Sequence, residues 1–137
     1  MEQFNKAQDS KRKSDLAQIQ RGLETYYQDC HRYPPAIQNQ ITSDCTGSIA
    51  VTWGSSWRPY MDVLPTDPAS GKKYVYWVDE SNGGQAYAVY SFLARASIDT
   101  QACNGTFGCE GANSKGLLCG GAGVICAYGV SSPNISP

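Results

Sequence analysis

The sequence predicts an α+β domain: a long N-terminal helix packed on a three- to four-stranded antiparallel sheet, with disulfide-stapled C-terminal loops. Apolar residues recur at helical spacing near the N-terminus, two later segments alternate with period two, and six cysteines are spread over 137 residues. We expect one domain over residues 1–137, made of a helix (1–31), a loop region (32–72), a β-hairpin (73–93) and a cysteine-rich loop with a last strand and tail (94–137).

The helix is predicted from a stripe of residues spaced by three and four, which share one helical face. The stripe consists of Leu16, Ile19, Leu23, Tyr26 and Cys30. We take the first four as core residues, and the Pro34-Pro35 pair ends the element.

The first half of this helix is polar, with Ala7 as the only apolar residue between Lys6 and Asp15. The basic triplet at 11–13 is flanked by acidic residues, which is typical of a solvated helix face. We therefore expect the helix to pack through its second half only. A polar helix without a buried face is marginal alone, so we expect the natural chain to continue upstream into an apolar helical segment.

The loop region begins with residues 36–56, which show no hydrophobic period and predict a long irregular connection. A Cys30–Cys45 bridge would staple it, and closing a loop of about 15 residues contributes about 3 kcal/mol in the chain-entropy model. Turn residues then follow closely and should deliver the chain into the sheet. They are Pro65, Asp67, Pro68 and Gly71.

The hairpin is predicted from alternation in residues 73–79 and 85–93, joined by a glycine-containing connection. Tyr74, Tyr76 and Val89 are the core residues expected from it. Both faces of each strand carry large apolar groups, so we expect the helix to cover one face and either the long loops or a neighbouring subunit to cover the other. A last strand is predicted at 124–128, and residues 131–137 read as a frayed tail.

The six cysteines predict three disulfides in an oxidising compartment, with the pairing left open among 15 arrangements. They are Cys30, Cys45, Cys103, Cys109, Cys119 and Cys126. The competing interpretation is a zinc site, which is disfavoured because there is no C-x-x-C pair and only one histidine, His31. Because His31 and Cys30 are adjacent at a helix end and diverge, no catalytic residue is predicted.

Two stretches together resemble the type IV pilins, and most closely the major pseudopilins of type II secretion systems. The first runs from Lys6 to Pro35, with Leu16, Ile19, Leu23 and Tyr33-Pro34 in the spacing of the family's N-terminal helix. The second, within residues 57–93, is similar to the family's P-x-DP-x-G-x-x-Y-x-Y stretch.

The resemblance implies a structural protein without enzymatic activity that assembles into filaments with copies of itself and with other pilins or pseudopilins. It also implies inner-membrane anchoring before assembly, and a final place in a surface filament or the periplasm. Family members often bind calcium late in the domain, but a cysteine-rich insert occupies that region here and no ligand motif is present. No cofactor or metal residue is therefore predicted, and calcium is left open on the resemblance alone.

Two other functions are kept open by the sequence. Trp53, Trp57 and Trp77 with nearby tyrosines could line a carbohydrate-binding or adhesive surface, although such residues in strands are more often packing residues. A small hydrolase would need two loop carboxylates in one pocket. A nucleic-acid partner is not expected, because the net charge is −1 and basic residues are scattered after the helix.

Overall fold

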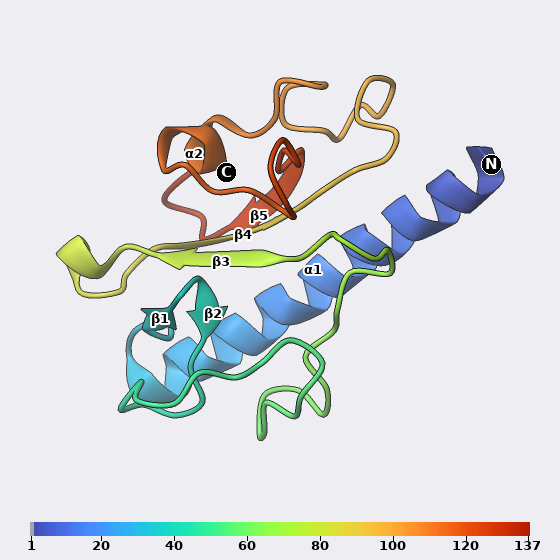
Figure 1. Ribbon diagram of the computed structural model, residues 1–137. Helices are drawn as coiled ribbons and strands as arrows, with labels where there is room; N and C mark the ends of the chain where they lie inside the picture. Colours follow the sequence, from blue (N-terminus) through green and yellow to red (C-terminus); the bar gives the residue numbers. More distant parts are fainter. Residues whose placement is uncertain (1) are drawn as a thin grey trace.

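The structure, a computed structural model that describes residues 2–137, has three layers built around a small antiparallel sheet (Figure 1). The long helix α1 and the loops of residues 32–72 lie on one side of the sheet, and the cysteine-rich segment lies on the other. The elements in chain order are α1 (Glu2–Cys30), β1 (Ala36–Ile37), β2 (Gln40–Ile41), β3 (Val75–Val78), a 3-10 helix (Glu80–Asn82), β4 (Tyr87–Ser91), α2 (Glu110–Ser114) and β5 (Tyr128–Ser131). This confirms the α+β class, while Met1 lies outside the described residues.

The main sheet has the strand order β3-β4-β5, with all pairs antiparallel. Tyr76 faces Val89 in the β3–β4 register, and Val89 faces Val130 in the β4–β5 register. Since side chains alternate between faces, these rows fill the core under α1, while Val75 and Tyr90 point into the opposite layer. The cysteine-rich segment covers that opposite face. The sequence left open whether a long loop or a neighbouring subunit would lie there, and the structure places a loop of the same chain.

The seven predicted core residues all belong to the hydrophobic cluster between α1 and the sheet. They are Leu16, Ile19, Leu23, Tyr26, Tyr74, Tyr76 and Val89, each no more than 1% exposed. The helix lies against β4 and β5 through this cluster. Burying one such side chain stabilises the fold by about 1.5–3 kcal/mol.

A second, two-stranded sheet occurs where the sequence predicted only an irregular loop. β1 and β2 pair with Ala36 opposite Ile41, and the two residues between them, Gln38 and Asn39, have φ angles of 51° and 61°. Positive φ at both central positions matches the twist of a tight hairpin. Because the turn contains no glycine, the usual sequence signal is missing and the prediction was wrong here.

The last strand begins later than predicted, at Tyr128 instead of residue 124. The Cys119–Cys126 disulfide closes a short ring over the predicted strand, so the chain first pairs with β4 after that ring. The tail is also not frayed. The carbonyl of Pro137 accepts a hydrogen bond from Gly111 N at 2.9 Å, and Ser132 is only 1% exposed.

Candidate functional site: the anchor between helix and head

The N-terminal half of α1 is fixed to the head (residues 32–137) by a buried ion cluster centred on Arg12. The Arg12 side chain is fully buried, and its Nε and Nη2 donate to the two oxygens of Asp67 at 2.9 and 3.0 Å. Its Nη1 donates to Asp9 at 2.7 Å. The fork of Arg12 thus joins the helix to the turn-rich loop by a bidentate pair, the geometry that a guanidinium forms with a carboxylate.

Asp9 extends this cluster to the loop that follows β4. Its two carboxylate oxygens accept the backbone N–H groups of Ala94 and Arg95, both at 2.9 Å. The Arg12 guanidinium also lies over the ring of Phe92, 5.1 Å from the ring centre. One helical turn therefore holds two loops that are far apart in sequence.

Two further contacts surround the cluster. Asp15 accepts a hydrogen bond of 2.6 Å from the Tyr74 hydroxyl and pairs with Lys11 at 2.6 Å. Lys13 donates to Asp99 at 2.6 Å. Burial and the hydrogen bond to Asp15 raise the pKa of Tyr74 well above its ordinary value, so the hydroxyl remains a donor.

The charge state of Arg12 follows from its partners. Burial lowers the pKa of the guanidinium, but the hydrogen bonds and negative charges of Asp67 and Asp9 outweigh this and raise it on balance. Arg12 stays a cation, and its charge is matched inside the protein.

These findings correct the prediction that the basic triplet is a solvated face and that only the second half of α1 packs. Residues 9, 12 and 15 are buried. The missed signal was the spacing: 9, 12, 16, 19, 23, 26 and 30 continue one stripe in steps of three and four, with charged residues where apolar ones were sought. Complementary ion pairing explains why charges occupy these positions.

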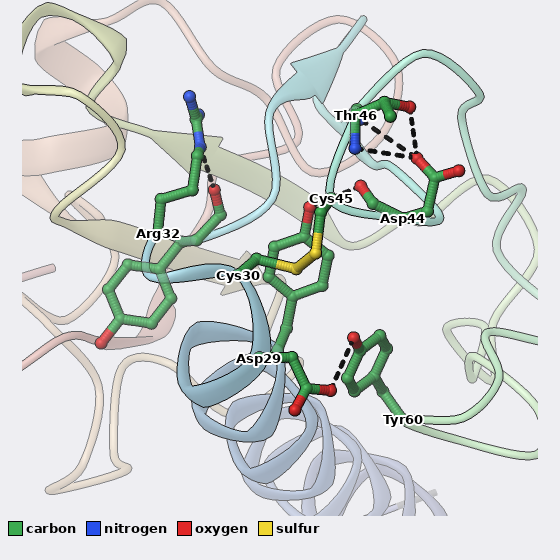
Figure 2. Close-up of a disulfide and its surroundings, with 10 residues drawn as sticks. Asp29, Cys30, Arg32, Asp44, Cys45, Thr46 and Tyr60 are labelled. Carbon is green, nitrogen blue, oxygen red and sulfur yellow. Dashed lines mark hydrogen bonds between the residues drawn. A yellow bond between two sulfur atoms is a disulfide. The ribbon is translucent and has the colours of Figure 1, made fainter.

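The C-terminal end of α1 is fixed by a disulfide between Cys30 and Cys45 (Figure 2). Beside it, Asp29 accepts a hydrogen bond from the Tyr60 hydroxyl at 3.0 Å. Burial, followed by this hydrogen bond, raises the pKa of Tyr60 to about 12. On the other side, the Tyr26 hydroxyl donates to the carbonyl of Asp44 at 2.6 Å. The helix end is thus tied to the loop region on two sides.

Aromatic packing also holds the second half of the helix, between the Arg12 cluster and the Cys30–Cys45 disulfide, which we call the two anchors. The ring of Trp57 is 6.4 Å from that of Tyr26 and 5.2 Å from that of Tyr60. Gly22 makes this approach possible, since a Cβ there would lie 2.8 Å from Cζ3 of Trp57. A groove of about 390 Å³ remains between this part of the helix and residues 60–63.

The turn-rich loop of residues 65–71, which lies in the stretch that resembles the pilin motif, takes part in the Arg12 cluster. Asp67 supplies the carboxylate for Arg12 and also accepts the N–H of Ala69 at 2.8 Å. Pro65 and Pro68 flank it, and Gly71 has a φ of 80°, which favours glycine. After this turn Lys73 N donates to the carbonyl of Cys119 at 2.9 Å, so the loop leads into β3 beside the cysteine-rich segment.

The other predicted features do not assemble into a reactive site. The remaining disulfides are Cys103–Cys109 and Cys119–Cys126, and no cysteine of residues 2–137 is free. Of the tryptophans, Trp53 and Trp57 join the helix-side cluster, whereas Trp77 packs in the opposite layer. The sheet therefore separates the three rings that a common sugar-binding surface would have to combine.

Most of the loop carboxylates form ion pairs with nearby arginine or lysine side chains, so they do not pair with each other as a hydrolase would require. Asp67 and Asp99 bind Arg12 and Lys13, and Glu80 binds Arg32 at 2.6 Å. Within residues 2–137, no group of three or more His, Cys, Asp or Glu side chains is arranged to hold a metal ion.

None of the helices in the described part of the chain combines the length and apolar character needed to cross a membrane.

Comparison with known proteins gives one match. The family model described as type II secretion system (T2SS), protein G, matches residues 1–105. This range contains α1, both anchors and the first two strands of the main sheet, but not the last disulfide or β5. No curated protein and no solved structure matches the chain significantly.

Proposed function

The chain belongs to the family of type II secretion system protein G, the major pseudopilin, and from this premise we propose that it is a subunit of a secretion pseudopilus that assembles through its N-terminal helix. The family gives the chain a structural role in protein secretion and a place in the periplasm or the pseudopilus. Assembly through the helix, in a filament of copies and related pseudopilins, is the proposed step. The observation that carries it is the attachment of α1 to the head at both of its halves.

The outer face of α1 supports this proposal. Its centre is an exposed stripe of mainly small or uncharged polar residues: Gln3, Ala7, Ser10, Ser14, Gln18, Arg21, Thr25 and Gln28. The exposed charges of Lys6, Lys11 and Asp29 flank this stripe. Short side chains allow neighbouring helices to approach closely, and only one of these residues is charged. A bundle of such helices at a fibre axis would leave the heads outside, with the anchored face of each helix already occupied by its own head.

The two anchors give the mechanism a physical basis. A helix of 29 residues is about 44 Å long. It is fixed near its start by the Arg12 cluster and at its end by the Cys30–Cys45 disulfide. Displacement of the helix therefore carries the head with it, as assembly through the helix requires. We further propose that an apolar extension of the helix anchors the subunit in the inner membrane before assembly.

Cross-linking tests this assignment directly. In the full-length gene product, Ser14→Cys on the outer face of α1 should form disulfide-linked dimers in a secreting cell, and these should depend on the secretion system. The matched control is Ser81→Cys, an exposed position in the 3-10 helix that connects β3 and β4. Equal cross-linking at both positions, or dimers at Ser14→Cys that persist without the secretion system, would refute assembly through the helix.

A further inference from the structure

The cysteine-rich segment presents one aromatic side chain to solvent on a rigid support. Phe107 is 74% exposed, the highest value among the exposed large hydrophobic residues of the described chain. It lies in the short ring closed by the Cys103–Cys109 disulfide. An aromatic ring held outward in this way is typical of a binding contact, because little conformational freedom is lost when it docks.

The support of Phe107 is fixed by hydrogen bonds on both sides. Its N–H donates to the carbonyl of Asn104 at 3.0 Å, and its carbonyl accepts from Nδ2 of Asn113 at 2.8 Å. The next residue, Gly108, has a φ of 86° and packs so closely that a Cβ would lie 2.1 Å from Cγ2 of Ile125. The exposure of Phe107 is therefore built into the fold.

An apolar pocket of about 270 Å³ opens next to the preceding residue, Thr106, which is part of its lining. Its walls include Leu93, Ala96 and Ile125, and Thr106 stands at its edge. For comparison, a cavity of about 150 Å³ lined by aliphatic and aromatic side chains is enough to hold benzene. The pocket therefore has the size and the chemistry to receive one phenylalanine side chain.

We propose that this surface is a contact between two copies of the chain, in which Phe107 of each copy enters the pocket of the other. Thr106 lines the pocket and Gly108 lies against its wall, so the protruding ring and the cavity share one face of the molecule. A self-complementary face of this kind is satisfied by a two-fold axis, which makes both insertions at once. Phe107 and the pocket wall formed by Thr106 and Ile125 lie beyond residue 105, outside the matched range, and the proposal does not rest on the pseudopilin role.

The contact is weak by its dimensions. A buried aromatic side chain removes about 150–250 Å² from water, whereas a stable interface takes about 800 Å² from each partner. The chain should stay monomeric at micromolar concentration and pair reversibly at about millimolar concentration, the range that corresponds to a few such contacts. Such a contact becomes effective where subunits are crowded together.

Sedimentation equilibrium and NMR line widths of the chain, followed up to about millimolar concentration, test the proposal. Phe107→Ala should weaken self-association by about tenfold or more. Ser97→Trp, which fills the pocket from its exposed rim, should weaken it similarly. The matched control is Ile49→Ala. This isoleucine is 64% exposed and lies outside the proposed contact, so its removal should leave association unchanged.

Mixing the two disabled variants separates this contact from general stickiness. Phe107→Ala retains the pocket and Ser97→Trp retains the ring, so the mixture should form heterodimers through one insertion, while each variant alone stays monomeric. As a probe of the pocket alone, N-acetylphenylalaninamide should shift the amide signals of Ala96, Thr106 and Ile125. A wild-type chain that stays monomeric at millimolar concentration, or a Phe107→Ala variant that associates like wild type, would overturn the proposal.

Discussion

Replacing Arg12 by methionine should be among the most destabilising single changes in α1, although a basic residue in a polar stretch is ordinarily replaceable. The substitution keeps an unbranched apolar stem and removes the guanidinium, so Asp67 loses both of its Arg12 hydrogen bonds while its side chain remains fully buried. Removing one partner of a buried pair costs about 3–5 kcal/mol. At about 4 °C per kcal/mol for a domain of this size, the melting temperature should fall by about 12–20 °C.

Urea unfolding followed by circular dichroism measures this change, with the slope of the transition checked against wild type. Lys11→Met is the matched control, because it removes a neighbouring cation whose side chain is 49% exposed. The lysine end of its pair with Asp15 is screened by water and Asp15 keeps the hydrogen bond from Tyr74, so this variant should lose much less stability than Arg12→Met. If Arg12→Met and Lys11→Met lost similar amounts of stability, the ion cluster would not be an anchor.

Further predictions concern the core, the loss of stability at low pH and the disulfides. Gly22→Ala should destabilise the fold because the new methyl group meets the Trp57 ring at 2.8 Å, and intrinsic tryptophan fluorescence should report the displaced ring. Leu23→Asp should unfold the head, since it puts a carboxylate at a fully buried position at a cost of several kcal/mol. Burial raises the pKa of Asp99, but the hydrogen bond from Lys13 leads the contributions that lower it below 3.8 on balance. The stability it contributes is therefore present above pH 3.8 and lost as the pH falls through the lowered pKa, and Asp99→Asn should flatten the acid limb of the unfolding curve. Thiol titration under denaturing, non-reducing conditions should find no free thiol, and two reactive thiols per chain would contradict the three bridges.

The second half of α1 and the β3–β4 hairpin could be predicted because one rule, burial of apolar side chains, determines both their period and their place. Leu16 to Cys30 repeats at helical spacing, and Tyr74 to Val78 alternates as a strand between two apolar layers. In these segments local preference and tertiary packing favour the same structure. The α+β class follows from them.

The Arg12 cluster could not be predicted by that rule, because its members satisfy one another across long intervals of sequence. Asp67 is 55 residues from Arg12, and the amides bound by Asp9 are 85 and 86 residues away. Nothing local to Arg12 distinguishes it from the half-exposed Lys11. The Gln38-Asn39 turn is similar: its left-handed backbone is accompanied by hydrogen bonds between Asn39 and Tyr76, which the local sequence does not reveal.

The charged half of the stripe also explains how the helix can be fixed in one position along its axis. Apolar contacts are non-directional, so a helix held only by Leu and Ile side chains could find a similar packing after sliding by one turn. The fork of Arg12 meets both oxygens of Asp67, and such a slide of about 5.4 Å would break both bonds and leave the charges buried without partners. In a filament built on helix contacts, the axial position of the helix sets the height of every head. A buried ion pair near one end and a disulfide at the other are therefore suited to a subunit whose surface contacts must repeat from copy to copy.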